Sequence, residues 1–251
     1  MDLAITGKVA LVTGGSAGIG RSIARQLAAE GVKVALTYHS QQAAAEQLAD
    51  ELGGIALPLS LDDPQSAIAC VRSTIARLGT IDILVNNAVM WGDGPTRDRF
   101  EDVPLATWQR MFRGNFECTY AAIQAALPTM RAKKWGRIIN LSSGTALDGV
   151  SGTGPYASAK SALHGLTSVL ARELGADGIL VNVVVPGITL TDRVAKHVTP
   201  DLEAARAAGY PIKRLLPPDE VAPTVVFLAS ALNTAVTGEI VRASGGRPYP
   251  Y

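Results

Sequence analysis

The sequence is poor in cysteine, in charge and in long apolar runs, and each shortage excludes a class of protein. Its 251 residues include only two cysteines, Cys70 and Cys118, without the spacing of a metal or disulfide motif, so we expect two buried free thiols and no metal site. A formal net charge of +1 argues against nucleic-acid binding. No apolar run approaches about 18 residues, and the start lacks a signal-peptide pattern. We therefore expect a cytoplasmic protein without a membrane partner.

The shortage of charge also bears on assembly. Charged residues make up 18% of the chain, against about 25% in a typical soluble domain. One predicted helix carries apolar side chains around much of its circumference: Met111, Phe112, Phe116, Tyr120, Ile123 and Leu127. A single sheet face cannot bury so wide an apolar surface. We expect part of it to lie in a contact between copies of the chain.

Apolar, β-branched runs alternate with segments of helical period along the whole chain. Strands are predicted at 8–13, 33–38, 55–59, 81–86, 137–141, 180–185 and 239–242, and helices near 18–30, 41–52, 64–78, 105–133, 156–174 and 218–231. Continuous apolar strands separated by helices indicate a parallel sheet covered on both faces. The predicted fold is α/β, a single doubly wound, Rossmann-type domain over residues 1–251. The irregular segments 89–104 and 188–218 leave strand ends and are expected to wall a substrate pocket.

A glycine-rich turn follows the first predicted strand and leads directly into a helix. Residues 13–20 read Thr-Gly-Gly-Ser-Ala-Gly-Ile-Gly, and Ile19, Ile23 and Leu27 share one face of that helix. Glycine lets the backbone approach a pyrophosphate closely, and the helix N-terminus offers free N–H groups to its charge. The spacing differs from the commoner G-x-G-x-x-G fingerprint of dinucleotide sites. The turn favours a dinucleotide site.

The same turn admits a different function. Residues 14–18 also match the G-x-S-x-G elbow of serine hydrolases, with Ser16 as the nucleophile. Such an enzyme needs an aspartate and a histidine further along the chain. The histidines available are His39, His164 and His197, and none stands in a distinctive setting. Hydrolysis is therefore the weaker alternative.

Further motifs follow later strands and complete a pattern. Asn86-Asn87-Ala88 comes after the fourth predicted strand, Ser143 after the fifth, and residues 156–160 read Tyr-Ala-Ser-Ala-Lys. Residues 186–191 read Pro-Gly-Ile-Thr-Leu-Thr. With the glycine turn, and in this order over essentially the whole chain, these motifs resemble the short-chain dehydrogenase/reductase family. The resemblance implies an NAD(P)-dependent oxidoreductase that forms homodimers or homotetramers.

The chemistry can also be argued from the residues. Tyr156 and Lys160 are four positions apart, so on a helix they share one face. An ammonium beside a phenol lowers the phenol's pKa from about 10 toward neutrality, where Tyr156 can exchange a proton with a carbonyl or alcohol oxygen. Ser143 can donate a hydrogen bond to the same oxygen. The resemblance further implies that Lys160 holds the nicotinamide ribose and that Asn115 supports a proton relay.

The resemblance assigns the cofactor site. Its contacts are expected from Gly14, Ser16, Gly18, Ile19, Gly20, Tyr38, His39, Ser40, Asp62, Asn87, Ala88, Tyr156, Lys160, Pro186, Gly187 and Thr191. No acid stands at the end of the second strand, where one would repel a 2′-phosphate, so NADP(H) is favoured over NAD(H). Arg21, His39 and Ser40 are the candidate phosphate partners.

Departures from the family pattern bear on the substrate. Val89 replaces a common glycine, and Ser244 stands before paired glycines where an aspartate is usual. The chain resembles 3-oxoacyl-carrier-protein reductases, yet Asp177 stands where those relatives commonly have a basic residue, and a like charge disfavours an acidic carrier. We therefore favour NADPH-dependent reduction of a bulky, hydrophobic ketone, as in the bacterial polyketide ketoreductases of antibiotic biosynthesis that the chain resembles. The alternatives are a 3-oxoacyl-carrier-protein reductase, an NAD-dependent alcohol dehydrogenase and a non-catalytic cofactor-binding protein.

A set of apolar residues is expected around the nicotinamide and substrate. They come from the two irregular segments and the stretch before Tyr156: Met90, Trp91, Val150, Leu190, Val194 and Tyr210. A pocket with few polar groups suits a hydrophobic ketone.

Overall fold

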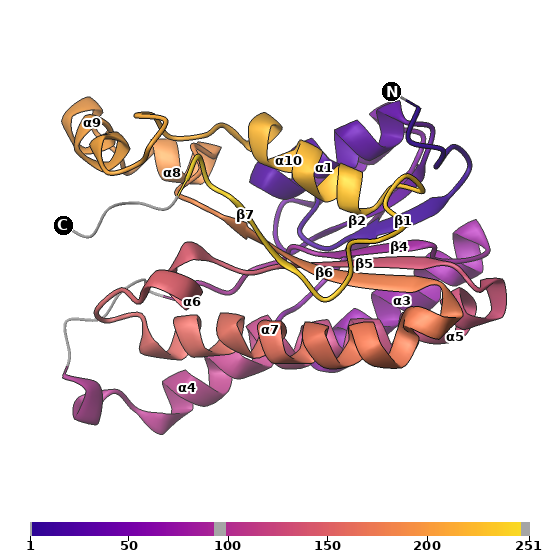
Figure 1. The fold of residues 1–251 in the computed structure, drawn as a ribbon, viewed down its shortest axis with the longest axis horizontal. Helices are drawn as coiled ribbons and strands as arrows, with labels where there is room; N and C mark the ends of the chain where they lie inside the picture. Colours follow the sequence, from indigo (N-terminus) through magenta and orange to yellow (C-terminus); the bar gives the residue numbers. More distant parts are fainter. Residues whose placement is uncertain (1, 93–98, 247–251) are drawn as a thin grey trace.

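A computed structural model describes residues 2–92 and 99–246, which form a parallel sheet between two layers of helices (Figure 1). The strands are β1 (Val9–Val12), β2 (Lys33–Tyr38), β3 (Ile55–Pro58), β4 (Ile83–Asn86), β5 (Gly136–Leu141), β6 (Ile179–Pro186) and β7 (Ile240–Ala243). Their order is β3-β2-β1-β4-β5-β6-β7, and every neighbouring pair is parallel. The strand order reverses between β1 and β4, and ligands bind at such a point beyond the carboxyl ends of the strands.

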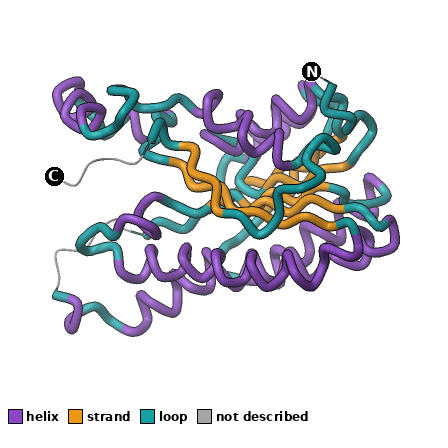
Figure 2. The backbone as a smooth tube through the Cα atoms, in the orientation of Figure 1, coloured by secondary structure: helices purple, strands orange, loops and turns teal. Residues whose placement is uncertain are grey.

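The helices divide between the two faces of the sheet, and each layer has its own core (Figure 2). On one face lie α1 (Gly18–Ala29), α2 (Gln42–Glu51) and α10 (Pro218–Leu228). On the other lie α3 (Pro64–Leu78), α5 (Cys118–Lys133) and α7 (Gly154–Leu174), with α4 (Leu105–Phe112) packed on α7. The predicted doubly wound fold is confirmed, because buried apolar strands need a helical cover on both faces.

Local sequence sets the ends of several helices. Asp63 caps α3 by accepting a hydrogen bond from the Gln65 amide at 2.9 Å, Pro64 occupies its first turn, and Gly79 ends it in the left-handed region. The short helices α8 (Asp192–Ala195) and α9 (Pro200–Ala208) begin after the capping hydroxyls of Thr191 and Thr199. Together with α6 (Gly144–Asp148), α8 and α9 stand beyond the carboxyl ends of the strands (Figure 1).

The single helix predicted over 105–133 is wrong in its middle. A π-helical turn at Arg113–Glu117 separates α4 from α5. A Cβ on Gly114 would lie 2.9 Å from Met90, and the Asn115 side chain bonds the Met90 backbone. The extra residue of the π-helical turn therefore lets the helix pack against the loop that contains Met90. Two 3₁₀ turns, Phe100–Asp102 and Gly175–Asp177, complete the described elements.

One buried cation has only carbonyl partners in the described part of the chain. The Arg137 guanidinium, on β5, donates to the carbonyls of Gly136, Gly178, Ser230 and Asn233. Burial lowers its pKa to about 10. It also stacks on the Trp135 ring at 4.5 Å. The hydrogen bonds to Ser230 and Asn233 join the middle of the sheet to the loop that follows α10.

Candidate active site

The glycine turn is held in place by hydroxyl and amide side chains at the ends of β1, β2 and β4. The Thr13 hydroxyl accepts hydrogen bonds from the amides of Asn87 and Ala88 at 2.9 and 3.0 Å. The Asn87 side chain donates to the carbonyls of Thr13 and Gly14, and the Gly14 amide donates to Thr37. These bonds satisfy the backbone of the turn from inside the protein, and α1 begins at Gly18 without a side-chain cap. Its first N–H groups are therefore available to an anion.

Two glycines of the turn are required by its close packing. Gly14 has a φ of +62°, and a Cβ there would lie 3.0 Å from the backbone of Ala88. A Cβ on Gly20 would lie 2.2 Å from the Gly14 carbonyl oxygen. Because both contacts are with backbone atoms, no side-chain movement relieves them. The turn and the start of α1 approach each other as a phosphate-binding backbone requires.

Ser143 and Tyr156 meet at the wall of a cavity beyond β5 and β6. Ser143 caps α6, Tyr156 lies in the first turn of α7, and Ser143 is close enough to act on the pKa of Tyr156 in the lowering direction. Lys160 follows one turn later, 2% exposed, and its ammonium donates to the Leu141 carbonyl at 2.9 Å. The Trp91 ring contacts Tyr156 edge-on with ring centroids 4.3 Å apart. The three predicted catalytic groups thus line one cavity, and the Trp91 ring packs against the phenol.

The predicted shift of the pKa of Tyr156 toward neutrality is wrong for this structure. Burial raises the pKa of Tyr156 to about 12, while the Ser143 hydrogen bond and the charge of Arg193 act in the lowering direction. Burial also lowers the pKa of Lys160 to about 8, because an ammonium loses hydration there. Tyr156 is therefore a neutral phenol at pH 7 and is ready to donate a proton.

Asn115 lies inside the π-helical turn, next to α7. Its side-chain amide donates to the carbonyls of Met90 and Met111 at 2.8 and 3.1 Å, and its oxygen accepts from the Met90 amide at 3.1 Å. All three bonds are to backbone. The described contacts of this side chain hold the loop that carries Trp91, and the predicted proton relay stays a prediction.

Two adjoining cavities contain the predicted site residues. One, of about 580 Å³, is lined by the glycine turn and the ends of β2 and β3, and the other, of about 710 Å³, contains Ser143, Tyr156 and Lys160. Five residues line both cavities: Ile19, Asn87, Val89, Thr191 and Arg193. Val89 fills the position of the missing glycine without a positive φ. A dinucleotide spans two such cavities, and the second retains room for a substrate.

Most of the predicted cofactor residues line one or both cavities. Those found there are Gly14, Ser16, Gly18, Ile19, Tyr38, His39, Ser40, Asp62, Asn87, Ala88, Tyr156, Lys160, Pro186, Gly187 and Thr191. Gly20 lies behind the turn, where its lack of a side chain matters. Asn86 bonds Asn140 across the sheet at 2.9 Å, as a structural residue would. His39 and Ser40 are at the end of β2, where no acid lines the cleft.

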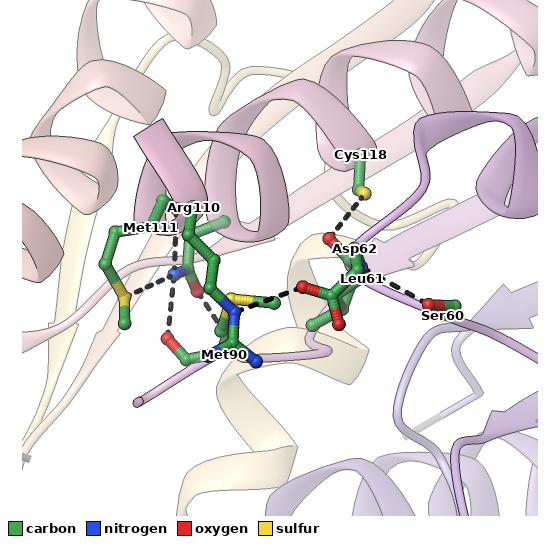
Figure 3. A network of polar contacts seen from close by, with 8 residues as sticks. Ser60, Leu61, Asp62, Met90, Arg110, Met111 and Cys118 are labelled. Carbon is green, nitrogen blue, oxygen red and sulfur yellow. Dashed lines mark hydrogen bonds and ion pairs between the residues drawn. The ribbon is translucent and has the colours of Figure 1, made fainter. Parts of the chain in front are cut away.

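Two charged pairs at this cleft were not predicted. Arg21, predicted as a phosphate partner, instead forms an ion pair with Asp192 at 2.9 Å and does not line the cleft. Asp62 forms an ion pair with Arg110 of α4 at 3.2 Å (Figure 3). In the same view, the Cys118 thiol donates to the Leu61 carbonyl, and burial raises the pKa of this thiol to about 12. Both cysteines are buried and free, as predicted.

The substrate side of the larger cavity is mainly apolar. Trp91, Val150, Val194 and Tyr210 line it as predicted, whereas Met90 lines the cofactor cleft and Leu190 lines neither. Sequence reasoning missed Arg193, His197 and Arg206, which also line this cavity. Nothing in the irregular segment 188–218 distinguishes their spacing from that of surface residues. Residues 93–98 of the predicted segment 89–104 lie outside the described residues.

The serine hydrolase alternative finds no support in the described hydrogen bonds. Ser16 lines the cofactor cleft, and the described contacts place no histidine or aspartate on it. His164 instead contacts Ser142 at 2.8 Å, behind Lys160. Burial lowers the pKa of His164.

Comparisons with known proteins agree with this geometry. Residues 14–247 match a family described as enoyl-(acyl carrier protein) reductase. The 3-oxoacyl-(acyl-carrier-protein) reductase FabG of Aquifex aeolicus is 36% identical, with 98% of this chain and 99% of the relative covered. The Escherichia coli K12 enzyme of the same name is 39% identical, with 96% and 97% covered. Solved structures include a 7α-hydroxysteroid dehydrogenase complexed with NADH and 7-oxo glycochenodeoxycholic acid, with a TM-score of 0.90, 34% identity and 99% and 97% coverage.

The glycine turn, the switch point and the convergent hydroxyls define an NAD(P)-dependent oxidoreductase that acts on the CH–OH/C=O pair. Matches over nearly the full length assign it further. The chain belongs to the short-chain dehydrogenase/reductase family.

Proposed function

We propose that the protein is an NADPH-dependent carbonyl reductase in which Tyr156 donates the proton. The observation that carries the proposal is that Ser143 and Tyr156 lie together on the wall of the larger cavity, which adjoins the dinucleotide cleft. The whole of residues 1–251 would act as one unit, with the segments 89–104 and 188–218 bounding the substrate. Homologous 3-oxoacyl reductases and a ketone-bound steroid dehydrogenase support this class of chemistry.

The residues divide the work at a ketone oxygen. The reduced nicotinamide, when bound, supplies the hydride to the carbonyl carbon. The Ser143 hydroxyl donates a hydrogen bond to the oxygen as its charge develops, and Tyr156 transfers its proton there. A neutral phenol suits this step, because burial raises the pKa of Tyr156 to about 12. Lys160, one turn along α7, would hold the ribose and stabilise the phenolate left behind.

The test of this proposal is Tyr156→Phe. Removing one hydroxyl should lower kcat for ketone reduction at least a thousandfold, because it removes the proposed proton donor. The affinity for NADPH should change less than threefold, as measured by the quenching of tryptophan fluorescence. Leu202→Ala, which shortens an exposed side chain on α9, controls for effects of mutation and purification that are unrelated to the site. Retained turnover in Tyr156→Phe would contradict the assignment, and loss of NADPH binding as well would indicate misfolding.

The preference for NADPH rests on what surrounds the end of β2. His39, Ser40 and Ser16 line the cleft there and can bind a 2′-phosphate, and no acid stands at the end of β2. The two acids that line the cleft, Asp62 and Asp192, are each paired with an arginine. Arg21 is held by Asp192, so the site relies on hydroxyl and imidazole groups. The steroid dehydrogenase was solved with NADH, which makes NAD the natural alternative. Ser40→Asp should reverse the preference, since a carboxylate repels the phosphate and accepts from the ribose hydroxyls.

A bulky hydrophobic ketone, such as one derived from a polyketide, is the proposed substrate. The supporting observation is the apolar lining of the larger cavity, including Trp91 and Val194. A carrier-bound 3-oxoacyl group is the alternative that the relatives support. Asp177 is held by Arg131 and Lys134 here, so the position is less acidic toward a carrier than the sequence alone indicates.

Two further activities remain as alternatives. The family description favours reduction of the C=C bond of an enoyl thioester. Hydrogen-bond donors aimed at an oxygen, as Ser143 and Tyr156 are, serve a carbonyl better than a carbon–carbon bond. A non-catalytic cofactor-binding protein would show no NADPH oxidation with any ketone. Parallel assays with crotonyl-CoA, acetoacetyl-CoA and an aryl ketone separate these activities.

Assembly into homodimers or homotetramers is proposed from the exposed apolar side chains of α5 and α7. Tyr120 and Val169 are 47% and 52% exposed. Met111 and Ile123, predicted in the same surface, are buried within the chain instead. Light scattering at micromolar concentration tests the proposal, and a monomer would contradict it. No helix in residues 2–92 and 99–246 has the length and hydropathy to cross a membrane, and location in the cytoplasm stays a prediction.

A further inference from the structure

Two arginines and a histidine line the wall of the substrate cavity that α8 and α9 build. Arg193, His197 and Arg206 all line the cavity that contains Ser143 and Tyr156. In Figure 1, α8 and α9 stand across the carboxyl ends of the strands from α6. These three side chains are the polar exception on a wall otherwise made of residues such as Val194, Val198 and Tyr210.

None of these three side chains has an acidic partner among the described residues. Other arginines of the region are paired, Arg21 with Asp192 and Arg214 with Glu220. The described ion pairs include neither Arg193 nor Arg206, and the hydrogen bonds include no side-chain contact of His197. The cavity wall therefore carries uncompensated positive charge.

The acid that lines the same cavity is already neutralised. Both carboxylate oxygens of Asp148 accept hydrogen bonds from the Arg242 guanidinium, at 2.7 and 2.9 Å. Glu203, three positions before Arg206 on α9, forms no described ion pair and does not line the cavity. The groups that face the substrate thus give a positive local field, and a concave apolar wall concentrates such a field.

The three side chains come from two consecutive elements, α8 with the turn that follows it and α9. Arg193 and His197 are one helical turn apart, because α8 and the turn that follows it keep the bonds Ala195 to Thr191 and His197 to Val194. Arg206 is half-buried on α9, while its neighbours Ala204 and Ala205 are exposed. A half-buried guanidinium on an apolar wall is suited to bidentate binding of a carboxylate or phosphate.

We propose that the substrate is a ketone with an anionic oxygen group remote from its reacting carbonyl, and that Arg206, with Arg193 and His197, binds that group. This inference rests on the proposed function and narrows its substrate class. A carboxylic acid and the phosphate of a CoA-type thioester present the same oxygen chemistry. Arg193 lies where the two cavities meet and near Tyr156, so Arg206 is the residue that separates substrate binding from cofactor binding.

The test compares matched anionic and neutral ketones. One pair is a tetralone with a propionate side chain and its methyl ester, and the other is acetoacetyl-CoA and acetoacetyl-pantetheine. In the wild type, kcat/KM should favour the anionic member of one pair by about tenfold or more, as a charge-assisted hydrogen bond predicts. Arg206→Gln should reduce that ratio about tenfold, and Arg206→Lys should restore part of it. The preference should also weaken between 50 and 500 mM salt.

Lys196→Gln is the matched control. It removes one positive charge from the same segment, but Lys196 is exposed and does not line the cavity, so the ratio should stay at the wild-type value. An effect confined to the tetralone pair identifies a carboxylate, and one confined to the acetoacetyl pair identifies a phosphate. A ratio near one in the wild type for both pairs, or an equal ratio in Arg206→Gln, overturns the inference.

A measurement without turnover separates this inference from the proposed function. Calorimetry with saturating NADP⁺ gives the Kd of the tetralone propionate for the wild type and for Arg206→Gln. Binding weakened about tenfold by the substitution supports the anion site even if no ketone is reduced, a result that would contradict only the proposed reaction. Equal Kd values for the tetralone propionate exclude a carboxylate site, and equal Kd values for acetoacetyl-CoA as well overturn the anion site and leave the reductase assignment intact.

Discussion

The cofactor cleft and the substrate cavity are neighbours, yet their polar groups are organised in opposite ways. Around the glycine turn, Thr13, Thr37 and Asn87 engage backbone groups within the protein, and Asp62 and Asp192 each have an arginine partner. On the substrate wall, Arg206, which lines only that cavity, has no described partner. A cleft for an invariant ligand can be completed by the protein itself. A wall that meets a particular substrate leaves its polar groups for that substrate to satisfy.

The strongest test of this contrast is Gly20→Ala in the cofactor cleft. The added Cβ would meet the Gly14 carbonyl oxygen at 2.2 Å, so the turn must move away from the phosphate-binding position. We expect the affinity for NADPH to fall at least about a hundredfold in a fluorescence titration. Gly175→Ala, where an added Cβ meets nothing within 4 Å, is the control. Unchanged affinity in Gly20→Ala would show that the turn is more adaptable than its hydrogen bonds indicate.

Thr13→Val should have the next largest effect. The substitution keeps the shape of the side chain but leaves the backbone amides of Asn87 and Ala88 without their hydrogen-bond acceptor. An unsatisfied amide costs about 1–3 kcal/mol, so the free energy of unfolding should fall by about 2–4 kcal/mol in urea. Thr13→Ser, which keeps the acceptor, should recover most of this loss. Equal stability of the valine and serine variants would contradict the role given to the hydroxyl.

The pH dependence of stability tests the interior of the substrate side. Burial lowers the pKa of Lys160 to about 8, so between pH 8 and 10.5 the unfolded chain binds more protons at this site than the folded one. Stability contributed at this site therefore rises with pH across that window, and the penalty of the buried charge is fully present below it. Relative to the wild type, Lys160→Met should be more favourable at pH 7 than at pH 10 by about 2 kcal/mol in urea unfolding. An effect independent of pH would mean that the lysine keeps its ordinary pKa.

Arg21→Gln should have the smallest effect. Its ion pair with Asp192 joins side chains that are 42% and 71% exposed, and exposed pairs contribute little to stability. We expect less than a threefold change in NADPH affinity and a nearly unchanged melting temperature. His39→Gln, a change within the cleft, provides the comparison. A larger loss in Arg21→Gln than in His39→Gln would restore Arg21 as a phosphate partner.

Features that are set by residues close together along the chain could be predicted from the sequence, whereas features that depend on distant residues could not. The bounds of α3 were predicted at 64–78 because Asp63, Pro64 and Gly79 set both ends locally. The interruption of the helix at Arg113–Glu117 was not, because it depends on Met90, which is distant along the chain. The Ser143, Tyr156 and Lys160 group is encoded by spacing on one strand end and one helix.

Other features of the site could not be predicted from any pattern in the sequence. Asp62 and Arg110 are joined only by the packing of α4 against the cleft, and no spacing rule links two such residues. The pKa of Tyr156 depends on how deeply α7 is buried, so its direction could not be obtained from the neighbouring Lys160. Arg206 lies in an irregular segment where a cavity-facing residue has no periodic pattern to identify it.

Five residues line both cavities, and this sharing limits which positions can change without affecting both ligands. A change in Ile19, Val89 or Arg193 alters the lining of both cavities, so selection for a new substrate there would also alter the dinucleotide cleft. His197 and Arg206 line only the substrate side. Substitutions on α9 and just after α8 can therefore change the substrate cavity without changing the dinucleotide cleft. Directed evolution of substrate preference is best begun at these positions.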